Sequence, residues 1–231
     1  MTKAVILCGG RGTRLGEHGL ALPKALIPIG GQPVIRHLMS AYARHGITEF
    51  ILCLGHLGDV IRAWFAENDV PWSVQMFDTG VDTNTGGRLL AIQDAVGDGT
   101  FCATYGDGLS NIDISSSLAF HATHGRAATI AVVHPISNFG IVEIGPENEV
   151  RRFTEKPVMS EWVNGGFFVF NSSIFEYLTA DSVLEREPFE QLCAEDEMRA
   201  FKHEGFWKCM DTYKDTIEME KLWREGAPWT R

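Results

Sequence analysis

Short apolar runs and segments with helical spacing alternate along the first half of this chain. Apolar runs of this length, rich in β-branched residues, predict buried strands, and they lie at 4–8, 49–54, 72–77, 101–105 and 127–134. Apolar residues spaced three and four apart predict helices between them, at 33–46, 58–65, 89–96 and 113–125. This alternation predicts a mostly parallel sheet with helices on both faces, which is a Rossmann-like α/β fold.

The second half of the chain has a different pattern. Apolar and polar residues alternate over 138–146 and 149–153, which predicts a small β-hairpin extension. A strand is predicted at 163–170, an edge strand at 201–204, short helices at 172–177 and 188–193, and a last helix at 213–223. We expect the tail from Gly226 to be loosely ordered. The length of 231 residues fits a single domain, 1–231.

A cluster of glycines and cations follows the first predicted strand. Gly9, Gly10 and Gly12 are interleaved with Arg11, Thr13 and Arg14, and Lys24 follows Pro23. The spacing fits neither the Walker loop nor the dinucleotide-binding fingerprint. Glycines alone are equally typical of an ordinary strand–loop–helix turn. Arg14 and the Pro23–Lys24 pair favour phosphate binding, because backbone N–H groups and cations suit phosphate oxygens.

The segment 78–90 is rich in Thr, Gly and Asp and is predicted to be a loop, with a helix beginning at Leu89. Such loops beyond parallel strands are where ligands bind. We expect the N–H groups of Gly86 and Gly87 to face a base or a ribose. Arg88 would then be a cation at a helix start, where cations are unfavourable, and this favours a ligand-binding role for it.

Two further positions carry candidate chemistry. Asp107 lies between two glycines after a predicted strand, where a carboxylate faces the ligand crevice and can hold a metal, although an Asp-Gly turn is an equally good explanation. Asn164, before Gly165 and Gly166, can bind hydroxyl groups with both its donor and its acceptor.

Charge and cysteine content narrow the class of protein. The net charge of −10 argues against duplex nucleic acid and anionic membranes as partners, and a nucleotide-binding protein of this charge needs local cations and a divalent metal. Five cysteines without a CxxC pair favour a reducing cytoplasm over a disulfide framework or a zinc site. We expect no signal peptide and no membrane span.

Seven blocks together resemble the sugar nucleotidyltransferase family, and most closely its glucose-1-phosphate cytidylyltransferase members. The first block matches the family signature through Gly9, Gly10, Gly12, Thr13, Arg14, Leu15, Pro23, Lys24, Gly31 and Pro33. The others are TGGRL at 85–89, TYGDG at 104–108, EKP at 155–157, NGGFFV at 164–169, GFW at 205–207 and MDT at 210–212. Members transfer a nucleotidyl group from a nucleoside triphosphate to a sugar 1-phosphate and release pyrophosphate.

The resemblance implies a set of site residues. Its catalytic residues would be Arg14, Lys24, Asp107, Lys156 and Asp211, with Asp107 and Asp211 holding Mg²⁺. The nucleotide, CTP, would be bound by Leu7, Cys8, Gly9, Gly10, Arg11, Gly12, Thr13, Arg14, Lys24, Thr83, Gly86, Gly87, Arg88, Gly106 and Asp107. The acceptor would be bound by Tyr105, Glu155, Lys156, Asn164, Gly165 and Trp207. The half 1–135 would bind the nucleotide and 136–231 the acceptor, in a cytoplasmic enzyme expected to form a homo-oligomer.

The sequence departs from the cytidylyltransferase pattern near the acceptor side. A long insert before residue 78 is absent, and Ile136, Ser137 and Asn138 replace a Pro-Gly-Arg triplet. Two alternatives therefore stay open with the same chemistry: a non-sugar phosphate or phosphonate acceptor, or UTP or dTTP as the donor. A third reading, a regulatory subunit that binds nucleotide without catalysis, is disfavoured by the presence of all five predicted catalytic residues.

Overall fold

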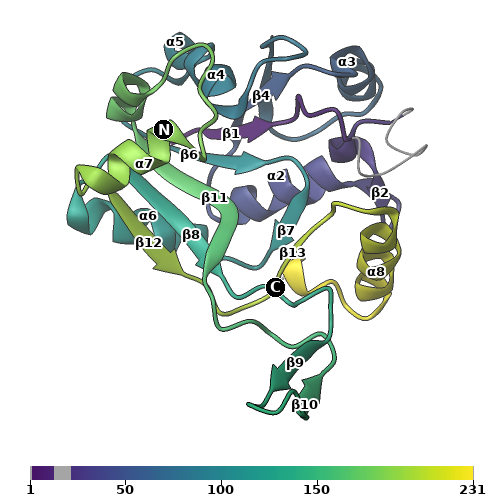
Figure 1. Ribbon diagram of the computed structural model, residues 1–231. Helices are drawn as coiled ribbons and strands as arrows, with labels where there is room; N and C mark the ends of the chain where they lie inside the picture. The colour runs from purple at the N-terminus through teal and green to yellow at the C-terminus, as the bar shows by residue number, and fades with distance from the viewer. Residues whose placement is uncertain (1, 13–21, 231) are drawn as a thin grey trace.

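A seven-stranded sheet forms the centre of the molecule in the computed structural model, which describes residues 2–12 and 22–230 (Figure 1). The strands lie side by side in the order β12 (Met198–Lys202), β8 (Ala128–Val133), β11 (Val163–Asn171), β6 (Thr100–Tyr105), β1 (Ala4–Leu7), β4 (Glu49–Leu54) and β5 (Ser73–Asp78). Strand β11 is antiparallel to both of its neighbours, and the other pairs are parallel. The predicted mostly parallel α/β sheet is confirmed.

Helices cover both faces of this sheet, because residues of the strands alternate between two apolar layers. In β1, Ala4 and Ile6 belong to one buried cluster, and Val5 and Leu7 belong to the other. The first layer packs against α2 (Val34–Arg44), α3 (Gly58–Glu67), α6 (Ile114–His124) and α8 (Tyr213–Arg224). The second packs against α4 (Thr85–Leu90), α5 (Gln93–Val96), η3 (Ser172–Tyr177) and α7 (Glu187–Ala194).

Three small two-stranded sheets and two 3-10 turns complete the described part of the chain. The pairs are β2 (Pro28–Ile29) with β3 (Gln32–Pro33), β7 (Gly108–Ser110) with β13 (Trp207–Cys209), and β9 (Ile141–Ile144) with β10 (Val150–Thr154). The 3-10 turns are η2 (Lys24–Leu26) and η4 (Pro228–Thr230). The β9–β10 hairpin was predicted, and it projects away from the central sheet (Figure 1). Among the described residues, no helix combines the length and apolarity needed to cross a membrane.

Two predicted boundaries are wrong. The helix expected at 89–96 begins at Thr85 and forms two short helices, α4 and α5. The edge strand expected at 201–204 is β12, which begins at Met198, although it does lie at an edge of the sheet.

The tail is also better ordered than expected. Trp229 is 1% exposed, and its ring lies against those of Phe206, Trp223 and His37. Arg44 Nη2 donates to the Trp229 carbonyl at 2.6 Å, which ties the tail to α2. A large aromatic side chain buries enough apolar area to order a short terminal segment, and this is why the composition of the tail was misleading.

Candidate active site

A cavity of about 630 Å³ opens where β1 and β6 end. These strands are parallel neighbours with Leu7 opposite Tyr105, so the loops that follow them emerge side by side. Most of the predicted site residues line this cavity: Leu7, Cys8, Gly9, Gly10, Arg11, Lys24, Thr83, Arg88, Tyr105, Gly106, Asp107, Asn164, Gly165, Trp207 and Asp211. Residues from distant parts of the sequence therefore meet at the carboxyl edge of the sheet, as expected for this class of fold.

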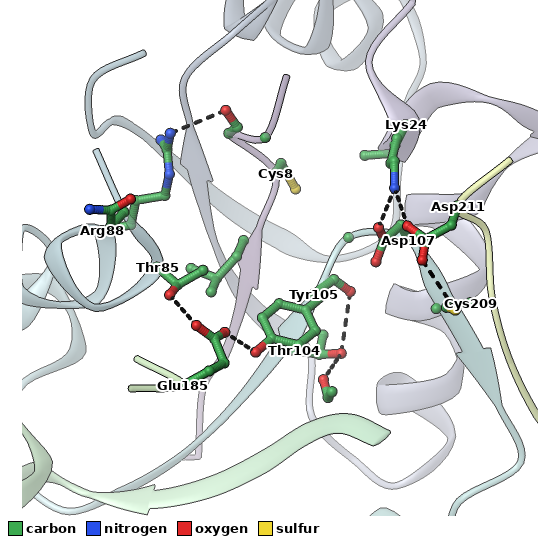
Figure 2. Close-up of a pocket in the computed structure, with 18 of the residues that line it drawn as sticks. Cys8, Lys24, Thr85, Arg88, Thr104, Tyr105, Asp107, Glu185, Cys209 and Asp211 are labelled. Atoms are coloured by element: carbon green, nitrogen blue, oxygen red, sulfur yellow. Dashed lines mark hydrogen bonds and ion pairs between the residues drawn. The ribbon is translucent and has the colours of Figure 1, made fainter. Parts of the chain in front are cut away.

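Lys24 lies between two carboxylates at one side of the cavity (Figure 2). Its Nζ is 2.9 Å from Asp107 Oδ2 and 2.8 Å from Asp211 Oδ1, and its side chain is 18% exposed. Burial alone would lower the pKa of Lys24, but the Asp107 charge and the hydrogen bonds that Lys24 donates to both carboxylates outweigh it and raise that pKa. The ammonium therefore stays charged and neutralises two carboxylates that would otherwise repel each other.

The small sheet of β7 and β13 brings Asp107 and Asp211 together. Gly108 pairs with Cys209 in this antiparallel ladder, and one step further Met210 N donates to the Asp107 carbonyl at 2.8 Å. The capping box of α8, made by Thr212 and Asp215, fixes the backbone on the other side of Asp211. This pairing places Asp211, which follows the aromatic residues Phe206 and Trp207, beside the Gly106–Gly108 turn.

Arg88 lines the cavity, but it does not lie at a helix start as predicted. The residue is in the last turn of α4, where a cation is favourable, so the argument from an unfavourable helix position is wrong. Its side chain is 5% exposed and donates to the carbonyls of Leu54 at 2.9 Å and Gly9 at 3.1 Å. A further bond goes to Thr79 Oγ1 at 2.8 Å. Burial lowers the pKa of the guanidinium, which nonetheless stays protonated.

Two arginines connect the glycine loop after β1 to neighbouring segments of the chain. A Cβ on Gly9 would lie 2.0 Å from Arg88 Nη1, so only glycine allows the guanidinium to reach this backbone. Arg11 Nη2 pairs with Asp82 Oδ1 at 2.5 Å at the exposed rim, and this contact lowers the pKa of Asp82. The two contacts join the loop after β1 to α4 and to Asp82.

Gly86 and Gly87 serve helix packing, which corrects their predicted role. Both N–H groups donate to the Ser182 carbonyl, at 3.0 and 3.2 Å, so they do not face a base or a ribose. A Cβ on Gly87 would lie 2.1 Å from the Ala180 carbonyl oxygen. The two glycines let α4 approach the 180–182 backbone closely, and neither lines the cavity.

The predicted acceptor residues divide into two groups. Tyr105, Asn164, Gly165 and Trp207 line the cavity, and Trp207 Nε1 donates to the Gly165 carbonyl at 2.7 Å. Gly166 lets the Tyr105 ring pack closely, because a Cβ there would lie 2.6 Å from that ring. Glu155 and Lys156 are exposed next to the β9–β10 hairpin and do not line the cavity.

The phosphate loop predicted from the sequence also includes Gly12, Thr13 and Arg14. Gly12 is described but does not line the cavity. Thr13 and Arg14 lie outside the described residues. The roles of these residues and of Lys156 stay predictions.

Sequence reasoning missed several residues that line the cavity. Glu185 is the most notable, because its carboxylate accepts hydrogen bonds from the Tyr105 hydroxyl and from Thr85 Oγ1, the latter at 2.8 Å. It lies in a polar loop of ordinary composition, and no spacing or motif marks it. The others are Ala25, Val81, Asp82, Asn84, Thr85, Thr104, Gly108, Gly166, Phe167, Val183 and Cys209.

The donor set around Lys24 suits a hard divalent cation. Asp107 and Asp211 present carboxylate oxygens close enough to share one ammonium, and Mg²⁺ is commonly held by one or two carboxylates together with phosphate oxygens and waters. Within residues 2–12 and 22–230, no group of three or more His, Cys, Asp and Glu side chains could hold a metal by itself. A magnesium ion here would thus rely on oxygens of a bound phosphate.

Curated relatives match the chain along nearly its full length. A glucose-1-phosphate cytidylyltransferase of Salmonella typhi is 41% identical over 98% of each chain. A probable glucose-1-phosphate cytidylyltransferase of Bacillus subtilis is 38% identical over 97% of each chain. The Salmonella alignment runs over 253 positions, more than the 231 residues here, so that relative contains residues that this chain lacks.

The fold agrees with these matches. The crystal structure of a putative glucose-1-phosphate thymidylyltransferase from Bacillus anthracis superposes with a TM-score of 0.74, at 21% identity, over 97% of this chain and 96% of that chain. The sequence profile of the family described as "Nucleotidyl transferase" matches residues 3–225. With the cavity at the carboxyl edge of the sheet and the match along the whole domain, the chain belongs to the nucleotidyl transferase family.

Proposed function

We propose that this protein transfers a cytidylyl group from CTP to a sugar 1-phosphate, releasing pyrophosphate and forming a CDP-sugar. The observation that carries the proposal is the Lys24–Asp107–Asp211 group. It lies in a cavity that is also lined by the glycines of the loop after β1, Gly9 and Gly10. The identity of 38–41% to cytidylyltransferases over nearly the whole chain supports CTP as the donor.

The chemistry needs positioning and charge rather than covalent catalysis. The acceptor phosphate attacks the α-phosphorus of CTP in line, and pyrophosphate leaves from the opposite side. No general base is required, because a phosphate monoester is already ionised near neutral pH. The backbone of Gly9 and Gly10 would hold the triphosphate, and Lys24, with Arg14 as the resemblance implies, would neutralise the charge that develops on pyrophosphate.

Asp107 and Asp211 would hold the Mg²⁺ ion that this proposal requires. When bound, the ion supplies positive charge that lets two anionic substrates approach each other. The carboxylates would hold the ion close to the end of β6, where Asp107 is placed by the hydrogen bond from Met210 N to its carbonyl, one step beyond the β7–β13 ladder.

The acceptor assignment is the finer part of the proposal. The named relatives act on glucose 1-phosphate according to their titles, and we propose the same class of acceptor here, bound by Tyr105, Asn164, Gly165 and Trp207, with Lys156 gripping its phosphate. Residues 1–135 would bind the nucleotide and 136–231 the acceptor within a single domain. We also propose a cytoplasmic homo-oligomer.

The deciding experiment offers each of CTP, UTP, dTTP, ATP and GTP with Mg²⁺ and a panel of acceptors, and records pyrophosphate release. The panel contains glucose 1-phosphate, other sugar 1-phosphates, non-sugar phosphates and phosphonates. We expect the highest kcat/KM for CTP with a sugar 1-phosphate. Release that favours UTP, dTTP or a non-sugar acceptor would select one of the open alternatives, and no release with any pair would identify a binding protein.

Two variants show whether the activity arises in this cavity. Asp107→Asn and Asp211→Asn keep the shape of each side chain but remove a charge. Each should raise the Mg²⁺ concentration needed for half-maximal activity. The double variant should lose less activity than the two single losses combined, because the pair acts as a unit. Wild-type Mg²⁺ dependence in either single variant would contradict the shared metal site.

A further inference from the structure

The Glu185 carboxylate lies in the cavity with two hydroxyl groups bound to it (Figure 2). It accepts from Thr85 Oγ1 at 2.8 Å and from the Tyr105 hydroxyl. Thr85 Oγ1 in turn accepts from Leu184 N at 2.9 Å, so the backbone beside Glu185 is fixed on the start of α4. Glu185 is therefore held in one position although its side chain is exposed to the cavity.

Tyr105 keeps its hydroxyl proton toward this carboxylate. Burial, together with the adjacent Glu185 charge, raises the pKa of Tyr105 well above its ordinary value. The phenol is thus a hydrogen-bond donor throughout the physiological range. Each carboxylate oxygen accepts one of these two bonds and has further lone pairs with which it can accept more.

The charges of the cavity differ from one side to the other. Figure 2 shows Glu185 on one side of Tyr105 and the Lys24–Asp107–Asp211 group on the other. Glu185 forms no ion pair with any described residue, whereas the cations Lys24 and Arg11 are paired with other carboxylates around the cavity. A phosphate would be repelled by Glu185, and neutral hydroxyl groups would be attracted as donors.

Tyr105 connects Glu185 to the predicted acceptor residues of β11 rather than to the glycine loop after β1. Asn164 Nδ2 is 3.5 Å from the Tyr105 hydroxyl, and the Tyr105 ring packs on Gly166. Asn164 and Gly165 belong to the same strand, β11, and Trp207 is bonded to Gly165. A carboxylate, an amide and two aromatic rings on one wall form a surface suited to a polyhydroxylated ring.

We propose that Glu185 is a specificity-determining residue that accepts hydrogen bonds from hydroxyl groups of the acceptor sugar and keeps its phosphate at the Lys24 side of the cavity. This inference rests on the proposed function, because it assigns the sugar end of the same acceptor. It predicts that an acceptor needs a hydroxyl group within reach of Glu185, and that losing this hydroxyl and losing Glu185 have the same effect.

The experiment crosses Glu185→Ala and Glu185→Gln with a set of monodeoxy sugar 1-phosphates. Glu185→Ala should raise the acceptor KM about tenfold or more, as expected for a lost hydrogen bond to a charged group, while the KM for CTP changes less than about twofold. In the wild-type enzyme, one monodeoxy analogue should show a similar rise in the acceptor KM. In Glu185→Ala, the same analogue should show no further rise in KM relative to the parent sugar 1-phosphate. Glu185→Gln should fall in between.

A matched control separates this role from mere folding. Glu190→Gln changes an exposed carboxylate in the first turn of α7 that does not line the cavity, and we expect wild-type kinetics and melting temperature. The proposal is overturned if Glu185→Ala raises the KM for CTP instead, which would place the ribose there. It is equally overturned if the variant lowers kcat for all acceptors without changing the deoxy pattern, which would mark Glu185 as a brace for Tyr105. Absence of activity with every sugar phosphate in the wild type would instead contradict the proposed function.

Discussion

Lys24 occupies the space where the proposed function needs a divalent cation. Its ammonium is 2.8–2.9 Å from an oxygen of each carboxylate, so Mg²⁺ cannot sit between Asp107 and Asp211 until Lys24 moves away. Lys24→Met keeps the length of the side chain and removes its charge. We predict that this variant binds Mn²⁺ about tenfold more tightly than the wild type without nucleotide, because no competing cation remains. Electron paramagnetic resonance of free Mn²⁺ measures this.

The chain offers a matched control for that experiment. Lys208 also bridges two carboxylates, Asp215 at 3.2 Å and Glu218 at 2.7 Å, but it does not line the cavity. Lys208→Met should leave Mn²⁺ affinity at the proposed site unchanged. If Lys24→Met bound Mn²⁺ no better than the wild type, Lys24 would not compete with the metal.

Arg88 is the second residue whose surroundings make a definite prediction. Arg88→Met removes the charged donor to the Leu54 and Gly9 carbonyls and to Thr79 Oγ1. The Leu54 and Gly9 carbonyls keep other donors, so the cost is that of lost hydrogen bonds to a charged group, roughly 1.5–3 kcal/mol. We therefore expect a loss of about 3 kcal/mol in the free energy of unfolding, measured by urea denaturation.

Arg126 provides the comparison for Arg88. It pairs with Asp196 and Glu197 and its side chain is 38% exposed, so Arg126→Met should cost less than about 1 kcal/mol. A fully stable Arg88→Met that had lost nucleotide binding would argue for a direct ligand contact instead.

The site roles of single residues were predictable from the sequence only where the residue belongs to a recognisable motif. Asp107 followed from a glycine-flanked turn after a strand, but its partner Asp211 came from the family resemblance, because the β7–β13 ladder that joins them spans about a hundred residues of sequence. Arg88 was assigned from a helix start that lies elsewhere. Glu185 had no signal, since its position depends on where a loop folds over α4.

At the scale of elements, the strands were the most predictable part. Their apolar runs gave β4 with its observed bounds and β1 to within one residue. One of the two misplaced boundaries was that of α4, because two glycines ordinarily weaken a helix. Tertiary packing reverses that preference here, since α4 lies so close to the 180–182 backbone that a Cβ does not fit at either glycine.

Gly87→Ala tests this packing. The new Cβ would meet the Ala180 carbonyl oxygen at 2.1 Å, and because this oxygen belongs to the backbone, the helix itself must shift. Overpacking of this kind costs roughly 1–3 kcal/mol, which for a chain of this length lowers the melting temperature by about 2–4 °C per kcal/mol. Gly108→Ala is the control, because its Cβ would be 4.0 Å from the nearest atom. Equal melting temperatures for the two variants would contradict the packing role.

At the scale of the whole molecule, the tail closes the core rather than trailing from it. Trp229→Ala removes a side chain that is 1% exposed and contacts the rings of Phe206 and Trp223. Truncating a buried tryptophan costs about 3–5 kcal/mol, and we expect a cooperative transition shifted to lower denaturant with an unchanged m-value. Trp162→Ala is the comparison, because that ring is only half-buried, lies beneath Lys202, and should cost less when it is removed. If Trp229→Ala lowered the free energy of unfolding as little as Trp162→Ala, the tail would not contribute to the core.

The donor nucleotide should stabilise the entire fold, because its site is assembled from segments that follow β1, β5, β6 and β13. Closing these segments around one ligand links them, and any ligand that binds only the folded state raises the melting temperature by mass action. At a concentration 100 times its Kd, a nucleotide adds about 2.7 kcal/mol, which corresponds to roughly 5–10 °C here.

With Mg²⁺ present and nucleotides at equal concentration, CTP should give the largest shift in differential scanning fluorimetry. Asp107→Asn should reduce that shift, since the metal then neutralises the triphosphate less well. A larger shift with UTP or dTTP would assign the base pocket to that nucleotide and contradict CTP as the donor.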